Sequence, residues 1–213
     1  MPTPIFDEAR MQYETPREGI TIGGYVARRL HKTRLLQPVA DLLKRDSARA
    51  LAQIALYATA ASTSFGPAIY QPDSDPPGKV IQTVDPETEA RITVTCEGDL
   101  RFSYRIEMSN VGVLSGVETI TGTTVGWRGL GMPAPTTFKF EAEQSDYRAD
   151  IIGLITSELT WGLGRLKIRG YGSLDFSDNQ GNRGKLTLDR SGEVIVSLTA
   201  YDGKTLALKE RLI

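Results

Sequence analysis

Apolar and polar residues alternate along most of the chain after residue 79. The alternation is clearest in residues 101–108, 165–176 and 194–200, and it places apolar side chains on one face of a strand and polar side chains on the other. Short turn signals separate the runs, and Asp202-Gly203 is the strongest because Asp-Gly suits a two-residue hairpin turn. Connections this short join antiparallel neighbours, so the pattern predicts a meander of about ten antiparallel strands.

The predicted fold class is therefore mainly β, and two arrangements of the strands satisfy it. An antiparallel meandering β-barrel is favoured because closure removes the edge strands, and because one face is apolar on strand after strand. The glycines Gly153, Gly170 and Gly172 fit strongly coiled strands. A two-layer β-sandwich is the alternative, since it shows the same alternation.

The first third of the chain has helical periodicity instead. Residues 20–36 predict a short helix, although Gly23-Gly24 weakens its start. A second helix should begin near Pro38 and end at Phe65-Gly66-Pro67, where glycine closes a helix and proline cannot continue it. Toward its end this helix is apolar on nearly every side, which predicts burial against the sheet or against a second subunit.

A segment rich in proline and acidic residues, 71–79, separates the two patterns and is typical of a linker. We therefore expect an N-terminal unit over 1–78, comprising an arm, two helices and the linker, and a β-barrel domain over 79–213. In layout this arrangement resembles lipocalin-like and allene-oxide-cyclase-like barrels at the level of the fold, and the sequence contains no motif of either family.

One predicted strand, residues 147–159, is apolar on both faces. Ile151 and Ile155 lie in one register, and Ile152 and Leu154 lie in the other. One face must meet the core, so the other should meet something else. We expect the N-terminal helix to pack on Ile152 and Leu154 from outside; the alternative is a subunit interface.

Composition and charge exclude several classes of function. The 25 basic and 26 acidic residues nearly cancel, and no basic cluster of the kind that binds nucleic acid is present. The single cysteine, Cys96, cannot form an intrachain disulfide, and the start of the chain does not resemble a secretory signal, so we expect a cytoplasmic protein. The longest apolar run, 50–61, is shorter than the roughly 20 residues of a transmembrane helix.

Motifs for metal or cofactor chemistry are incomplete. The only histidine, His31, has no second ligand or nucleophile near it in sequence. The glycine-rich stretch 126–133 is followed by prolines and an alternating strand, so it predicts a long loop at a barrel rim and not a dinucleotide site. Asp178, Gln180 and Asn182 approach the spacing of a calcium loop but lack its closing glutamate, and ordinary turn chemistry explains them. We therefore expect no metal and no cofactor.

The inner face of a barrel with this register would carry a set of aromatic and sulfur-containing side chains. In a barrel of eight or more strands such a face can enclose a cavity for one small apolar ligand, with the hydroxyl of Tyr104 as its polar contact. The predicted ligand-binding residues are Phe102, Tyr104, Met108, Trp127, Phe138 and Phe140.

Three functions are compatible with this architecture. The first is a protein that binds a small lipophilic molecule. The second is a cofactor-independent cyclase or isomerase that uses the same cavity to orient its substrate. The third is an interaction subunit, or a homo-oligomer, that docks on its partner through the N-terminal helices. The acid–base candidates for the second function are Tyr104, Arg105, Glu107, Asp150 and Glu158.

Overall fold

A computed structural model describes residues 39–64, 78, 80–84, 90–98, 101–119, 128–162, 165–191 and 193–211. The predicted first helix (20–36), most of the predicted linker, His31 and Trp127 lie outside the described residues. The division into units at residue 78 therefore stays a prediction. None of the described helices is long and apolar enough to cross a membrane.

The predicted second helix is present as two consecutive helices, α3 (Val39–Arg45) and α4 (Ser47–Ser64). They meet at Asp46, whose carboxylate oxygen Oδ1 accepts a hydrogen bond from the backbone N–H of Arg49 at 3.1 Å. An aspartate in this position caps a new helix, so Asp46 begins α4 as well as ending α3. The described part of α4 ends just before the predicted stop at Phe65-Gly66-Pro67.

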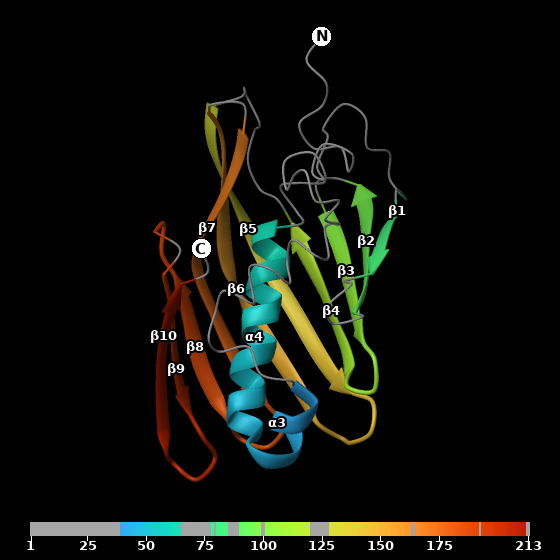
Figure 1. Cartoon of the computed structure of the whole chain (residues 1–213), viewed down its shortest axis with the longest axis vertical. Helices are drawn as coiled ribbons and strands as arrows, with labels where there is room; N and C mark the ends of the chain where they lie inside the picture. The colour runs from blue at the N-terminus through green and yellow to red at the C-terminus, as the bar shows by residue number, and fades with distance from the viewer. Residues whose placement is uncertain are drawn as a thin grey trace.

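Ten strands follow the helices and form a single antiparallel sheet in which each strand pairs with its neighbours in sequence (Figure 1). The strands are β1 (Val80–Val84), β2 (Arg91–Gly98), β3 (Arg101–Met108), β4 (Gly112–Thr119), β5 (Arg128–Ala142), β6 (Arg148–Gly162), β7 (Arg165–Asp178), β8 (Arg183–Leu188), β9 (Glu193–Thr199) and β10 (Thr205–Arg211). The predicted fold class, a mainly β antiparallel meander behind a helical segment, is confirmed.

Closure of the sheet is a point of correction. Among the described strands the ladder runs from β1 to β10, and these two strands do not pair with each other. The sheet is therefore curved and open, and not a closed barrel. The sheet can stay open because α4 lies in the hollow of the curve and contacts β4 to β9 (Figure 1). A buried helix covers the apolar face that closure would otherwise have to protect.

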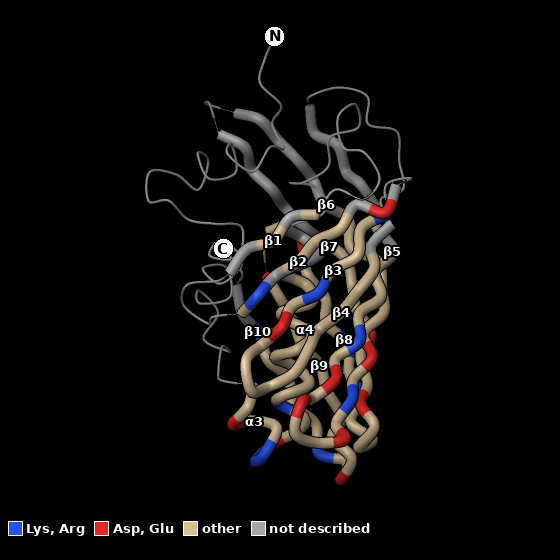
Figure 2. Tube along the Cα trace, turned by 90° about the vertical axis from the view of Figure 1, so that its right-hand side faces the viewer, with Lys and Arg blue, Asp and Glu red and all other residues tan. Residues whose placement is uncertain are grey.

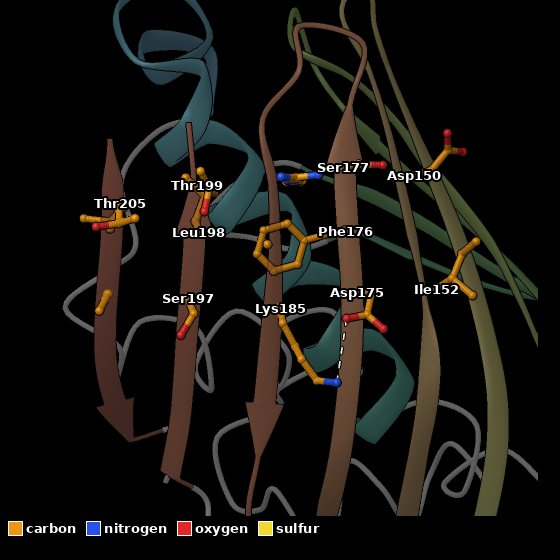
Figure 3. Close-up of a pocket in the computed structure, with 14 residues that line it drawn as sticks. Asp150, Ile152, Asp175, Phe176, Ser177, Lys185, Ser197, Leu198, Thr199 and Thr205 are labelled. Atoms are coloured by element: carbon orange, nitrogen blue, oxygen red, sulfur yellow. Dashed lines mark ion pairs between the residues drawn. The ribbon is translucent and has the colours of Figure 1, made fainter. Parts of the chain in front are cut away.

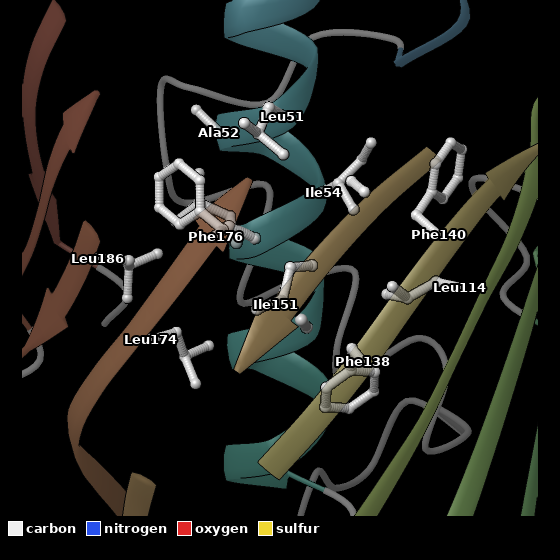
Figure 4. Close-up of a cluster of buried hydrophobic side chains, with 14 of the residues drawn as sticks. Leu51, Ala52, Ile54, Leu114, Phe138, Phe140, Ile151, Leu174, Phe176 and Leu186 are labelled. Atoms are coloured by element: carbon white, nitrogen blue, oxygen red, sulfur yellow. The ribbon is translucent and has the colours of Figure 1, made fainter. Parts of the chain in front are cut away.

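The core is the contact between α4 and the inner face of the sheet. Leu51, Ile54 and Leu56 on the helix are fully buried, and burial of each such side chain stabilises the fold by about 1.5–3 kcal/mol. Figure 4 shows Leu51 and Ile54 of the helix facing inward-pointing side chains of the sheet. The sheet residues of this cluster with 0% exposure are Phe102, Leu114, Phe138, Phe140, Ile151, Ile155, Leu174, Leu186, Val194 and Val196.

The helix packs on the opposite face of β6 from the one predicted. Ile151 and Ile155 are fully buried on the inner face, whereas Ile152 and Leu154 are 57% and 48% exposed on the outer face. The expectation that the helix covers Ile152 and Leu154 is therefore wrong. Both registers of this strand are apolar, so hydrophobicity alone does not distinguish the concave face from the convex one.

The glycine-rich stretch 126–133, predicted to form a loop, is mostly a strand. Most of this segment belongs to β5, in which Pro133 and Pro135 pair with Thr156 and Leu154 of β6. The other neighbour, β4, pairs only with Thr136–Ala142. Among the described residues, both prolines therefore lie where β5 pairs with β6 alone, and a strand tolerates proline best where it pairs on one side only.

Asn182 fixes the base of α4 against the sheet. Its side chain is fully buried, and its Nδ2 donates hydrogen bonds to Ser47 Oγ at 3.1 Å and to Asp178 Oδ2 at 2.7 Å. Its Oδ1 accepts a hydrogen bond from the backbone N–H of Tyr201 at 3.0 Å. One amide thus joins the first residue of α4, the β7–β8 turn and the β9–β10 turn. The turn interpretation of Asp178–Asn182 is in line with this network.

We predict that Asn182→Ala lowers the free energy of unfolding by about 2–3 kcal/mol, because Ser47 Oγ, Asp178 Oδ2 and the Tyr201 N–H each lose their hydrogen bond to the amide. The matched control is Gln180→Ala in the same turn, whose exposed side chain should change stability by less than about 0.5 kcal/mol. Urea unfolding followed by circular dichroism measures both. Equal stability of the two variants would show that the amide does not hold the helix.

Candidate ligand-binding face

Four of the six predicted ligand-binding residues come together on the inner face of the sheet. Phe102 and Tyr104 lie on β3, and Phe138 and Phe140 lie on β5, all at most 2% exposed. The rings of Tyr104 and Phe138 are 5.7 Å apart and tilted by 40°. The absent side chain of Gly116 on β4 makes room for the Phe138 ring, because a Cβ there would overlap it. These residues form a packed aromatic row.

The described part of the inner face is filled by protein where α4 covers it. Phe102, Tyr104, Phe138 and Phe140 belong to the same core cluster as Leu51 and Ile54 of α4. Met108 is different: it is only partly buried, and it also lines a hollow of about 530 Å³ on the outer face, near Arg105 and Glu107. Contact of any of these residues with a ligand stays a prediction, and beneath α4 it requires the helix to move.

The inner face is longer than the helix that covers it. The 18 residues of α4 span about 27 Å at about 1.5 Å per residue, whereas the 15 residues of β6 span about 50 Å at about 3.3 Å per residue. Figure 1 shows the β6–β7 hairpin extending past the end of α4. About half of the length of β6 therefore lies beyond the reach of α4.

The apolar pattern continues in this extension. The register of β6 and β7 is unbroken from Ala149 to Gly162, so every second residue after Ile151 keeps the parity of the inner face. At that parity Leu159 pairs with Ile168 of β7, and Trp161 pairs with Leu166. Leu130 of β5 pairs with Leu159 from the other side. Three adjacent strands thus present apolar positions of one parity beyond α4.

The acid–base candidates do not meet at one site. Tyr104 is buried on the inner face, whereas Glu107 lies on the outer face, where it pairs with Arg105 Nη2 at 2.9 Å and Arg91 Nη1 at 3.9 Å. Asp150 is exposed on the outer face of β6. Glu158 follows the outer-face parity of β6 and pairs in register with Gly131 and Arg169. The described residues contain no group of three or more histidine, cysteine or acidic side chains placed to hold a metal ion.

Basic and acidic residues interleave along the described strands instead of separating into one basic face (Figure 2). Short ion pairs reflect this mixing, as between Arg101 and Glu97 at 3.1 Å and between Lys209 and Glu193 at 3.0 Å. Nucleic-acid grooves need clustered positive charge. The described surface offers none.

Two buried polar atoms interrupt the apolar core without a hydrogen-bond partner, Gln53 Oε1 on α4 and the hydroxyl of Tyr147 before β6. Burial raises the pKa of Tyr147 far above its ordinary value, and the negative charge of Asp178 adds to the effect. The Asp178 carboxylate acts here through its charge, because it does not reach the hydroxyl in hydrogen-bonding geometry. The phenol therefore stays neutral in the folded protein.

The comparisons with known proteins support the fold and nothing finer. No protein-family model matches the chain, and no curated protein matches its sequence. Among solved structures, the Osh1 ORD domain in complex with cholesterol is similar, with a TM-score of 0.53 and 14% sequence identity. The match covers 88% of this chain and 46% of that one, so this chain spans about half the length of its structural neighbour.

We predict that alkaline pH destabilises the protein through Tyr147. The pKa of Tyr147 is raised in the folded protein, so above the ordinary pKa of about 10 the phenol ionises only in the unfolded chain. This ionisation favours unfolding, so the free energy of unfolding falls as the pH rises above that value. The free energy of unfolding of Tyr147→Phe should therefore fall less than that of the wild type as the pH rises from about 9 to about 11, a range centred on the ordinary tyrosine pKa.

Urea unfolding at several pH values, with phenolate absorbance as a second signal, tests this prediction. The control is Tyr201→Phe, because Tyr201 is 72% exposed. This variant should keep the wild-type dependence of stability on pH. If Tyr147→Phe follows the wild-type curve as well, the alkaline loss of stability comes from other groups.

Proposed function

We propose that this chain binds a small lipophilic molecule on the inner face of the curved sheet, where β5, β6 and β7 extend beyond α4. The observation that carries the proposal is the difference in length between the helix and the strands, together with the continued apolar register. No described helix covers this apolar face, and on such a surface an apolar ligand gains free energy by leaving water.

Two further observations support this function. The Osh1 ORD domain, which has a similar fold, was solved in complex with cholesterol. In addition, the aromatic row of Phe102, Tyr104, Phe138 and Phe140 continues the same inner face below the extension. A chain with one cysteine needs no oxidising compartment, so we propose that binding takes place in the cytoplasm.

The catalytic alternative, a cyclase or isomerase, gains no support from the described residues. Such an enzyme needs an acid or a base within hydrogen-bonding reach of the bound substrate. Of the predicted candidates only Tyr104 is placed on the inner face, whereas Glu107 and Asp150 lie outside it. The docking alternative loses α4 as its contact surface, because α4 is buried against its own sheet.

Binding of cholesterol and of a fluorescent C16 fatty acid to the full chain tests the proposal. We expect saturable binding of at least one probe, and Ile168→Glu should weaken it by about tenfold or more, because a charge at this position opposes an apolar ligand. Lys167→Glu is the matched control: it adds the same side chain at the opposite parity of β7, and it should leave the affinity unchanged.

Circular dichroism confirms first that each variant is folded. Two results would contradict the proposal: no saturable binding of either probe by the wild type, or equal loss of binding in both variants. Binding that survives Ile168→Glu would place the ligand elsewhere on the molecule.

A further inference from the structure

The outer face of β6 to β10 carries a hollow beside an apolar ridge. The ridge is formed by Ile152 and Leu154 of β6, which are 57% and 48% exposed. The hollow has a volume of about 690 Å³, and Figure 3 shows its floor across β7 to β10. Small side chains line its far side, among them Ser197, Thr199 and Ala207. A ridge of large apolar groups thus stands next to a trough of small ones.

Opposite charges lie on the two sides of this hollow. Asp150 and Asp175 line it from β6 and β7, and Arg183 and Lys185 line it from β8. Asp175 and Lys185 are partners in the strand register, and Lys185 Nζ lies 3.8 Å from Asp175 Oδ1. The Asp175 side chain is 71% exposed and the Lys185 side chain 53%. Two acidic side chains therefore lie on the β6–β7 side of the hollow, and two basic side chains lie beside them on β8.

We propose that this outer face docks on the same face of a second copy of the chain. The twofold axis would run parallel to the strands, between β7 and β8. Rotation about such an axis places β6 of one copy over β9 of the other, and β7 over β8. Two sheets packed in this way lie about 10 Å apart with their strands nearly aligned.

The strand register shows that the two faces are complementary under this rotation. Ile152, Asp175, Lys185 and Ser197 lie in one row across β6 to β9. The rotation sets Ile152 of each copy over Ser197 of the other, so the ridge enters the trough. In the same row the acidic Asp175 faces the basic Lys185 across the interface. Both contacts occur twice, as in every isologous dimer.

The next row adds an apolar contact. Leu154 lies in register, through Ser173 and Thr187, with Ile195 of β9. Ile195 is 41% exposed, and the rotation places it under Leu154 of the second copy. The interface therefore covers all three large apolar side chains exposed on the outer face of the described strands β6 to β9. An unrelated partner would need to reproduce this pattern, whereas a second copy carries it already.

Sedimentation velocity of the full chain over a range of concentrations tests the proposal. We expect a dimer in the micromolar range, and Ile152→Glu should raise the dissociation constant by about 100-fold, since it places a charge in the trough of the partner. The matched control is Val80→Glu on β1, which is equally exposed at 51% but lies far from this face in strand order. It should leave the dimer intact.

A charge exchange supplies a second test that does not depend on the apolar ridge. Asp175→Lys and Lys185→Asp should each weaken the dimer by about tenfold, because like charges then face each other across the interface. The double variant restores opposite charges and should return to within about threefold of the wild-type dissociation constant. These exposed positions tolerate substitution, which circular dichroism verifies.

Three outcomes overturn the proposal. The first is a monomer at every concentration up to about 100 µM, which is a dissociation constant too weak for a specific interface. The second is a dimer that Ile152→Glu leaves unchanged. The third is a double variant that is as weak as the two single variants. The proposed ligand-binding face lies on the other side of the sheet, so failure of either proposal leaves the other intact.

Discussion

The burial of α4 in the curve of the sheet is the contact on which the rest of the structure depends. A helix that is apolar on nearly every side is unstable in water, and a ten-stranded sheet with one apolar face has the same problem. Each covers the other, with Leu51 and Ile54 of the helix packed on Ile151 and Leu174 of the sheet. This contact also explains why the sheet need not close. The inner face is protected by a helix, and Asn182 sets the position of that helix by joining Ser47 to two turns at the base of the sheet.

The same contact has a limit that follows from backbone geometry. A helix gains about 1.5 Å per residue and a strand more than twice as much. A helix of 18 residues cannot cover strands of 15 residues from end to end. The paired apolar positions Leu159 and Ile168 lie in the remaining length. A sheet of longer strands therefore carries apolar positions of the same parity beyond the described helix, separate in the register from those that pack on it.

Much of the fold could be predicted from the sequence because alternation and turn chemistry are local. The antiparallel order and the number of strands both depend on neighbouring residues. The prolines of β5 misled the prediction because only the pairing pattern shows that, among the described strands, Pro133 and Pro135 lie where β5 pairs with β6 alone. The choice of face for α4 was also beyond the sequence, since Ile151 and Ile152 are chemically the same. Part of the candidate site was predicted, as Phe138 and Tyr104 do share a face, but packed core and ligand cavity have the same composition.

The two apolar registers of β6 are better understood once the inner one is assigned. Ile151 and Ile155 meet α4, so Ile152 and Leu154 cannot be explained by the same helix. Isolated apolar residues on a surface are common, but two on one strand, with Ile195 in the same row as one of them, form a pattern. The ion pair between these strands gives the pattern an orientation, because Asp175 meets Lys185 of the second copy when one copy is turned over onto the other. A sheet that is curved around a helix on its inner side leaves its outer side open to such a contact, so core packing and self-association use opposite faces of the same strand.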